Sequence, residues 1–227
     1  MTPYYEKNGI TIYCGDSDVI RPTIPDIDSI ISDVPYGVDF DTDYTRFSNA
    51  KRSDLLNTHR RIKGDKKPFD PTHLLEYNKV TIFGANNFSL PNGTFLVWDK
   101  RASDGDSTLM ADAEIAWLNT GHGVYIFRHT WGGFKRASER GTSYHPSQKP
   151  VVVMQWLLKR TNPRGLICDP YMGSGSTLVA AQNMGYQAVG IELDEDYCKI
   201  AVERLRQQSL FSVPETKKPE VKQGELF

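Results

Sequence analysis

The sequence of 227 residues predicts one α/β domain with a mostly parallel sheet, an antiparallel hairpin and helices on both faces. Two observations lead to this prediction. The last third of the chain alternates between helices, expected at 150–161, 177–184 and 194–208, and strands, expected at 165–169 and 186–192. In addition, the apolar run 29–33 ends abruptly in an acid, as a buried strand does when it delivers side chains to a site at its carboxyl end.

The first part of the chain supplies the other strands of the predicted sheet. They are expected at 9–14, which ends in a tight turn with Asp16, and at 79–83 and 94–98, with a brief helix at 71–78. Between them, the polar segment 38–68 has little apolar periodicity. A loop of this length inside a compact domain is usually functional or disordered.

Composition and charge limit the class of protein. The net charge of -1 argues against a uniformly basic nucleic-acid binder. However, eight basic residues stand against two acids between Arg46 and Lys67, and five against one between Arg128 and Lys149. Such runs are usually solvated faces, but two of them flanking one candidate site favour phosphate binding.

The N-terminus, the hydropathy and the cysteines of the chain predict its cellular compartment and its cross-links. A polar N-terminus and the lack of a long apolar window predict a soluble intracellular protein without a membrane span. The three cysteines lack C-x-x-C spacing, so we expect neither a disulfide framework nor a zinc site. We expect no metal.

The pattern changes in the segment 102–144, which reads as a small insertion. Two strands, 113–118 and 123–128, are joined by Asn119-Thr120-Gly121-His122, which is typical of a hairpin. After them, 130–136 mixes aromatic, flexible and basic residues as a surface segment does. Trp131 and Phe134 fit either a wedge that contacts a nucleic acid or a minor core.

A glycine-rich turn lies between the strand at 165–169 and the helix that follows it. It reads Asp169-Pro170-Tyr171-Met172-Gly173-Ser174-Gly175-Ser176-Thr177, and glycines let a backbone approach a ligand closely. Glu192 ends the next strand, where a carboxylate can accept both hydroxyls of a ribose. Because Asp169 would repel a pyrophosphate but tolerates an ammonium group, we expect a nucleoside cofactor such as S-adenosylmethionine.

Three motifs in this order resemble a known family. Asp33-Val34-Pro35-Tyr36 resembles the Asp-Pro-Pro-Tyr signature of amino-group DNA methyltransferases, His145-Pro146-Ser147-Gln148-Lys149-Pro150 their His-Pro-Thr-Gln-Lys-Pro motif, and the glycine-rich turn their cofactor loop. The order is similar to that of the β class, whose chain is a circular permutation of the Rossmann-like methyltransferase fold. The resemblance therefore implies a catalytic half at 1–101 with the basic loop 38–68, a small target-recognition insertion at 102–144, a cofactor half at 145–211 and a mobile tail at 212–227.

The resemblance also implies roles for individual residues. Asp33 and the Val34 carbonyl would accept hydrogen bonds from the target amino group in the turn made by Pro35, and Tyr36 would stack on a flipped base. Residues implied at the cofactor are Asp16, Lys149, Asp169, Tyr171, Gly173, Ser174, Gly175, Ser176 and Glu192. Lys149 could reach either the cofactor carboxylate or a DNA phosphate. Residues expected at DNA are Arg52, Arg60, Arg61, Lys63, Trp131, Lys135 and Arg136.

The implied reaction moves a methyl group from S-adenosylmethionine to an exocyclic nitrogen in double-stranded DNA and releases S-adenosylhomocysteine. Asp at position 33 favours adenine N6 over cytosine N4. Methylation of RNA or of protein glutamine, and a catalytically silent DNA-binding module, are the alternatives; the glutamine-modifying family typically has Asn at the position of Asp33. The resemblance places the protein in a bacterial or phage-encoded, cytoplasmic setting, either in a restriction–modification system or as an orphan enzyme.

Two short segments resemble peptides that bind bacterial replication sliding clamps. They are Gln207-Gln208-Ser209-Leu210-Phe211 and Gln223-Gly224-Glu225-Leu226-Phe227. The first also fits a helix end that packs on its own domain, whereas the second has no evident core to join.

Overall fold

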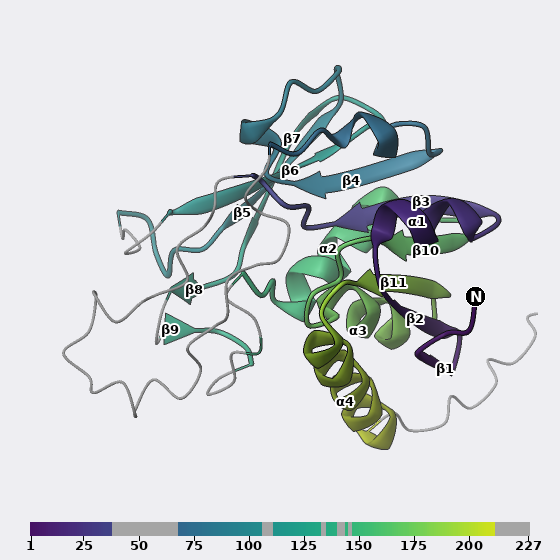
Figure 1. Ribbon diagram of the computed structural model, residues 1–227. Coiled ribbons are helices and arrows are strands. Elements are labelled where there is room, and N and C mark those ends of the chain that lie inside the picture. Colours follow the sequence, from purple (N-terminus) through teal and green to yellow (C-terminus); the bar gives the residue numbers. More distant parts are fainter. Residues whose placement is uncertain (38–67, 106–110, 133–134, 140–143, 145–146, 212–227) are drawn as a thin grey trace, which may run out of the picture.

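The computed structural model describes residues 1–37, 68–105, 111–132, 135–139, 144 and 147–211. In this part of the chain, nine strands form one sheet with the order β1-β2-β11-β10-β3-β4-β6-β5-β7 (Figure 1). Their bounds are β1 Tyr5–Lys7, β2 Ile10–Cys14, β3 Ile27–Ser32, β4 Lys79–Phe83, β5 Thr94–Asp99, β6 Ala113–Leu118, β7 Gly123–Arg128, β10 Leu166–Asp169 and β11 Ala188–Glu192. The strands from β2 to β4 are all parallel, while β1 and β6 run against their neighbours. The predicted fold class is therefore confirmed.

The three long helices lie on one face of this sheet. They are α2 Val151–Thr161, α3 Ser176–Asn183 and α4 Glu195–Phe211. In α2, the side chains of Val153, Met154, Leu157 and Leu158 are buried, which is the spacing of one helix face. This helix begins after Pro150, whose missing N–H would have no partner there, and ends at Asn162 in a left-handed conformation.

The opposite face is covered by short elements, namely α1 Ser17–Ile20 and the 3-10 turns η1 Arg21–Thr23 and η3 Pro71–Leu74. Successive residues of a strand point to opposite faces, so Ile31 of β3 packs under the long helices while Ile30 packs with Leu74 of η3. The predicted helix at 71–78 is reduced to this single turn. Asp70 caps it by accepting a hydrogen bond from the Thr72 N–H.

The predicted hairpin between 113–118 and 123–128 is wrong in its pairing. Strands β6 and β7 form as expected, but β5 lies between them and pairs with both. The connection passes over the beginning of β5, where the Thr94 hydroxyl donates a hydrogen bond to the Thr120 carbonyl at 2.8 Å. A tight hairpin is formed instead by β1 and β2, across Asn8 and Gly9, which both have positive φ.

Strand β6 lies within the sheet, between β4 and β5. Ala116, Trp117 and Leu118 are buried, and the Trp117 indole donates a hydrogen bond to the Pro91 carbonyl at 3.1 Å. After β7, the short strands β8 Trp131–Gly132 and β9 Lys135–Arg136 pair with each other as a separate two-stranded unit.

Within the described ranges, no helix combines the length and the apolar character that a membrane crossing requires. Several predicted features lie outside the described residues: the basic loop up to Lys67, Phe134, the His145-Pro146 pair and the tail 212–227 with its second clamp-like peptide. The first clamp-like peptide falls at the end of α4.

Candidate active site

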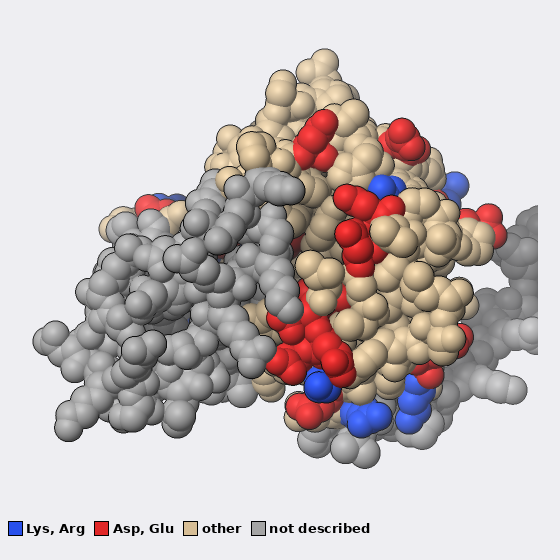
Figure 2. Space-filling model, viewed as in Figure 1, with Lys and Arg blue, Asp and Glu red and all other residues tan. Residues whose placement is uncertain are grey.

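Four carboxylates gather where adjacent parallel strands end. Asp169 and Glu192 are the last residues of β10 and β11, while Asp33 directly follows β3 and Asp16 lies two residues beyond β2. Because these four strands are neighbours in the sheet, their carboxyl ends meet at one edge. Acidic side chains are concentrated in the middle of the face shown in Figure 2. Such a site has a negative potential that favours a cationic ligand.

Asp33 is held at both oxygens by neighbouring side chains. The Tyr36 hydroxyl donates a hydrogen bond to Oδ1 at 2.5 Å, and the Lys149 ammonium donates one to Oδ2 at 2.5 Å. Burial raises the pKa of Asp33 above its usual value, although Lys149 acts in the opposite direction. Asp33 is thus a fixed hydrogen-bond acceptor, and because each carboxylate oxygen has two lone pairs, each can accept a second hydrogen bond.

Lys149 lies inside the protein and is shared by two acids. Its side chain is only 6% exposed, and its Nζ lies 3.1 Å from Oε2 of Glu114 at the beginning of β6. The prediction left open whether Lys149 reaches a cofactor carboxylate or a DNA phosphate. In this structure its ammonium is directed at Asp33 and Glu114 instead.

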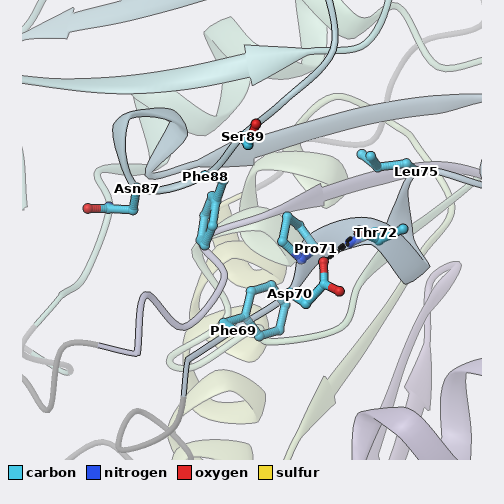
Figure 3. A pocket seen from close by; sticks show the side chains of 8 residues that line it. All are labelled: Phe69, Asp70, Pro71, Thr72, Leu75, Asn87, Phe88 and Ser89. Atoms are coloured by element: carbon cyan, nitrogen blue, oxygen red, sulfur yellow. Dashed lines mark hydrogen bonds between the residues drawn. The ribbon is translucent and has the colours of Figure 1, made fainter.

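The position of the Tyr36 ring requires a glycine at position 84. Gly84 follows β4 with φ +78°, and a Cβ at this position would lie 2.3 Å from Cε1 of Tyr36. Tyr36 also meets Phe88 edge to face, with ring centroids 6.4 Å apart. Beside this pair is a cavity of about 320 Å³ with the rings of Phe69 and Phe88 in its wall (Figure 3). Phe69 in turn meets Tyr171 edge to face, so aromatic surface extends from Tyr36 to the glycine-rich turn.

The Asp169 carboxylate holds the glycine-rich turn in place through hydrogen bonds. Its Oδ1 accepts hydrogen bonds from the Ser32 hydroxyl at 2.6 Å and the Tyr171 N–H at 3.2 Å, and its Oδ2 accepts one from the Thr177 hydroxyl. Burial raises the pKa of Asp169 to about 6 despite these bonds. Through these three bonds, Asp169 fixes the turn between β10 and α3.

Glu192 holds the same turn from the next strand. Its two oxygens accept hydrogen bonds from the Gly173 N–H at 3.0 Å and the Asp194 N–H at 2.8 Å. Burial raises the pKa of this carboxyl as well. Gly175 has φ +79°, and a Cβ there would lie 2.8 Å from Cβ of Ala201 on α4. A glycine is therefore required at this close approach of the turn to the helix.

The serines of the turn face α4 rather than open space. Ser174 and Ser176 are buried, and both accept hydrogen bonds from the guanidinium of Arg204. The same guanidinium donates to the Ser174 carbonyl at 2.7 Å and to Glu139 Oε1 at 2.9 Å. Glu139 also accepts a hydrogen bond from the Val151 N–H at the start of α2, so this cluster connects the turn to the preceding segment.

Asp16 occupies a more open position. It is exposed, and its carboxylate caps α1 by accepting a hydrogen bond from the Asp18 N–H at 2.8 Å. Nearby, the hydroxyl of Tyr171 lies 3.5 Å from Nε2 of His73. Among the described residues, no group of three or more His, Cys, Asp or Glu side chains is arranged to hold a metal ion.

The second basic stretch is largely engaged within the protein. Arg128 forms an ion pair with Asp99 at 2.9 Å, and Arg136 lies over the half-buried ring of Trp131 at 4.2 Å. Trp131 meets Trp98 edge to face and packs against the main core. Arg52, Arg60, Arg61 and Lys63 lie outside the described residues, as does the side chain of Lys135.

Sequence reasoning missed Glu114, Lys100, Ser32, Thr177, Glu139 and Arg204. Apart from Thr177, which lies eight positions from Asp169, each acts through a partner at least 14 positions away in the chain; Ser32 and Asp169, for example, are 137 positions apart. For Glu114 and Arg204, the sequence signal is a charged residue at a strand or helix position that its apolar neighbours mark as largely buried, as in Ala113–Leu118. The uncharged Ser32 and Thr177 carry no such signal.

Comparison with known proteins relates this site to one family. Residues 97–203, a little under half of the chain, match the sequence model of the DNA methylase family. The type II methyltransferase M.ScaI of Streptomyces caespitosus is 44% identical over 91 residues, which cover 39% of this chain and 30% of that protein. The putative methylase YubD of Escherichia coli (strain K12) is 44% identical over 66 residues, or 29% of either chain. The matched segments span less than a third of these relatives.

Solved structures extend the likeness to most of the chain. The PvuII DNA methyltransferase, which is specific for cytosine N4, aligns with a TM-score of 0.53 at 12% identity, covering 94% of this chain and 90% of that one. M1.HpyAVI in complex with SAM aligns with a TM-score of 0.50 at 20% identity, covering 86% and 98%. At these identities the likeness concerns the fold.

Proposed function

We propose, because residues 97–203 match the DNA methylase family, that this protein transfers a methyl group from S-adenosylmethionine to the exocyclic N6 of an adenine flipped out of double-stranded DNA. The observation that carries the proposal is the position of Asp33. Its carboxylate lies at the end of β3, beside the aromatic ring of Tyr36 and one strand away from the glycine-rich turn that follows β10.

The residues at the strand ends fit the proposed cofactor. When bound, S-adenosylmethionine supplies a methyl group on a positively charged sulfonium. Four carboxylates at one edge of the sheet favour such a cation, and the turn 169–177 brings backbone close to that edge. Glu192 is suited to the ribose hydroxyls and Asp16 to the adenine, while Asp169 and Tyr171 with Gly173 and Gly175 shape the methionine end. Ser174 and Ser176 keep the turn in place through Arg204.

Asp33 and the backbone carbonyl of Val34 prepare the nitrogen that is methylated. An exocyclic amino nitrogen is a poor nucleophile because its lone pair is delocalised into the ring. Two acceptors aimed at its protons favour a pyramidal nitrogen with a localised lone pair, and Asp33 can then take the proton that leaves. The Val34 side chain is buried, so valine at this position packs into the core while its carbonyl remains the functional group.

Reaching this nitrogen in a duplex requires base flipping, which costs a few kcal/mol. In the proposal, the base stacks on Tyr36, and stacking on an aromatic ring offsets roughly 1 to 3 kcal/mol of the free-energy cost of flipping. The basic loop, with Arg52, Arg60, Arg61 and Lys63, is the proposed phosphate contact. Trp131, Lys135 and Arg136 are the proposed contacts of the 102–144 region, and binding to a sliding clamp stays a prediction.

Mapping of modified bases tests the proposal directly. After expression in a host that lacks DNA methylation, sequencing is expected to find N6-methyladenine at one recurring sequence, with none in cells that express Asp33→Ala. Methylcytosine at a recurring sequence would instead support the alternative, cytosine N4. Unmodified DNA, together with purified protein that binds S-adenosylmethionine but leaves duplex DNA unmethylated, would overturn the proposal.

Gly84→Ala is expected to lower the kcat for methyl transfer roughly ten- to a hundredfold, the equivalent of the about 1 to 3 kcal/mol that base stacking contributes. The new methyl group would displace the Tyr36 ring from its hydrogen bond with Asp33. Gly185→Ala is the matched control, since Gly185 has a similar φ of +73° but no atom within 4 Å of an added Cβ. Both variants carry the same backbone strain, so equal rates in the two would contradict the proposed role of Gly84.

A further inference from the structure

We propose that Glu114 is a positioning residue that controls the acceptor strength of Asp33 through the lysine they share. The inference rests on the proposed methyl transfer for its consequence in catalysis, but its physical basis is the arrangement of four charged side chains. These are Asp33, Lys149, Glu114 and Lys100, which we call the charge chain.

The charge chain alternates in sign and is largely removed from solvent. Lys149 Nζ lies 2.5 Å from Asp33 Oδ2 and 3.1 Å from Glu114 Oε2, and Lys100 Nζ lies 3.2 Å from Glu114 Oε1. The side chains of the two lysines are 6% and 9% exposed, and those of Asp33 and Glu114 are 18% and 29% exposed. Two acids and two lysines balance in charge, so removal of any member leaves a net charge in a poorly solvated site.

Glu114 fixes where the Lys149 ammonium points. An ammonium has three donor hydrogens; here Nζ has Asp33 and Glu114 as partners and lies 3.4 Å from the Ser147 carbonyl. The ring of Phe83 lies 5.0 Å from Nζ. These neighbours come from four different parts of the chain, so they determine the position of Nζ more closely than the flexible lysine stem does.

Glu114 also limits how strongly Lys149 neutralises Asp33. A carboxylate whose negative charge is fully neutralised by a lysine with no other partner is a weak acceptor for the amino protons of a base. Lys149 favours the ionised form of Asp33, and because Glu114 attracts the same ammonium, Asp33 keeps more of its acceptor strength. Lys100 also pairs with Glu114 and neutralises part of its charge. Glu114 therefore attracts the Lys149 ammonium less strongly than an unpaired carboxylate would, and the ammonium stays beside Asp33.

The groups that face Asp33 have opposite effects on its titration. Besides the burial that raises its pKa, Lys149 lowers the pKa of Asp33 and Glu114 raises it, while the Tyr36 hydroxyl lowers it. The carboxylate of Asp169 lies near enough for Asp33 to raise the pKa of Asp169. Removing Glu114 and removing Lys149 should therefore move the titration of Asp33 in opposite directions. A purely structural role would not produce this opposition.

The test is a titration that needs no substrate. In the ligand-free full-length protein with 13C-labelled aspartate, the side-chain carboxyl shift of Asp33 is followed against pH in the wild type, Glu114→Gln and Lys149→Met. The midpoint is expected to move to lower pH in E114Q and to higher pH in K149M, and to lie between the two in the double variant. An unchanged midpoint in E114Q, or a shift in the same direction in both single variants, would overturn the inference.

A second variant covers the case in which E114Q does not fold. Lys100→Met leaves Glu114 in place but removes its other cation, so Glu114 attracts Lys149 more strongly. The Asp33 midpoint is then expected to move to higher pH, and an unchanged midpoint would again overturn the inference. Circular dichroism and thermal melting establish that each variant is folded before its titration.

A kinetic measurement connects the charge chain to the proposed reaction. E114Q is expected to lower kcat about tenfold or more, within the range of acid–base effects, with the KM values for DNA and S-adenosylmethionine nearly unchanged and the acid limb of the kcat profile moved to lower pH. A changed KM with unchanged kcat would contradict positioning. If the wild type shows no methyl transfer while the midpoints move as expected, the proposed function fails and the role of Glu114 stands.

Discussion

Asp33→Ala is expected to lower the rate of methyl transfer by about 10²- to 10⁴-fold, the range of a positioned acid–base group, while the affinity for S-adenosylmethionine changes little. The reason is that different residues at the sheet edge hold the proposed catalytic carboxylate and the proposed cofactor-binding turn. Asp33 accepts hydrogen bonds from Tyr36 and Lys149, whereas the glycine-rich turn is held by Asp169, Glu192 and Arg204. The rate is measured by transfer of labelled methyl to duplex DNA, and cofactor affinity by calorimetry.

A matched control for Asp33→Ala removes one carboxylate elsewhere. Glu203→Ala changes an exposed acid on α4 by the same substitution and the same charge, and its rate should equal that of the wild type. Full activity of Asp33→Ala would remove Asp33 from the mechanism. Joint loss of the rate and of cofactor affinity would show instead that the variant disturbs the whole site.

The second large effect is expected for Arg204→Met, which should lower the free energy of unfolding by about 3 kcal/mol, because it leaves a buried partner without its cation. Arg204 donates to the Ser174 carbonyl, to both serine hydroxyls of the turn and to Glu139. Loss of these bonds should also weaken cofactor affinity, since they hold the turn. Urea denaturation measures the first effect and calorimetry the second.

Two further variants show whether the geometry of Arg204 matters. Arg204→Lys keeps the charge but cannot reproduce the forked set of donors, so an intermediate stability is expected. Lys199→Met removes an exposed cation from the same helix, where its partners are the surface acids Glu195 and Asp196, and the denaturation curve should be unchanged. Equal stability of Arg204→Met and Lys199→Met would contradict the role assigned to Arg204.

The sequence predicts the strand ends of the site well because they depend on local patterns. An apolar β-branched run followed by an acid, as at Ile30 to Asp33, marks both a buried strand and the point where it releases a side chain. The same reasoning located Asp169 and Glu192, which end β10 and β11. Each of these predictions needs only a few neighbouring residues.

Contacts between residues far apart in the chain could not be predicted from such local patterns. Lys149 and Asp33 are 116 positions apart, and the sequence leaves open whether Lys149 reaches a cofactor carboxylate or a DNA phosphate; a hydrogen bond to Asp33 was not expected. The hairpin prediction failed for a related reason. Two short strands joined by a turn favour pairing with each other, but β5 has two edges, and the structure gives one to β6 and the other to β7.

The pairing of β3 with β10 has a consequence for synthesis of the protein. One edge of β3 pairs with β4, but its other edge belongs to β10, and Ser32 and Asp169 are 137 positions apart. At a ribosomal rate of 5 to 20 residues per second, β3 waits roughly 7 to 27 s for this neighbour to be made. During that time, an apolar strand edge is open to incorrect pairing. The chain therefore acquires its reactive centre only after β10 has been made, and chaperones that shield β3 should raise the yield of active protein.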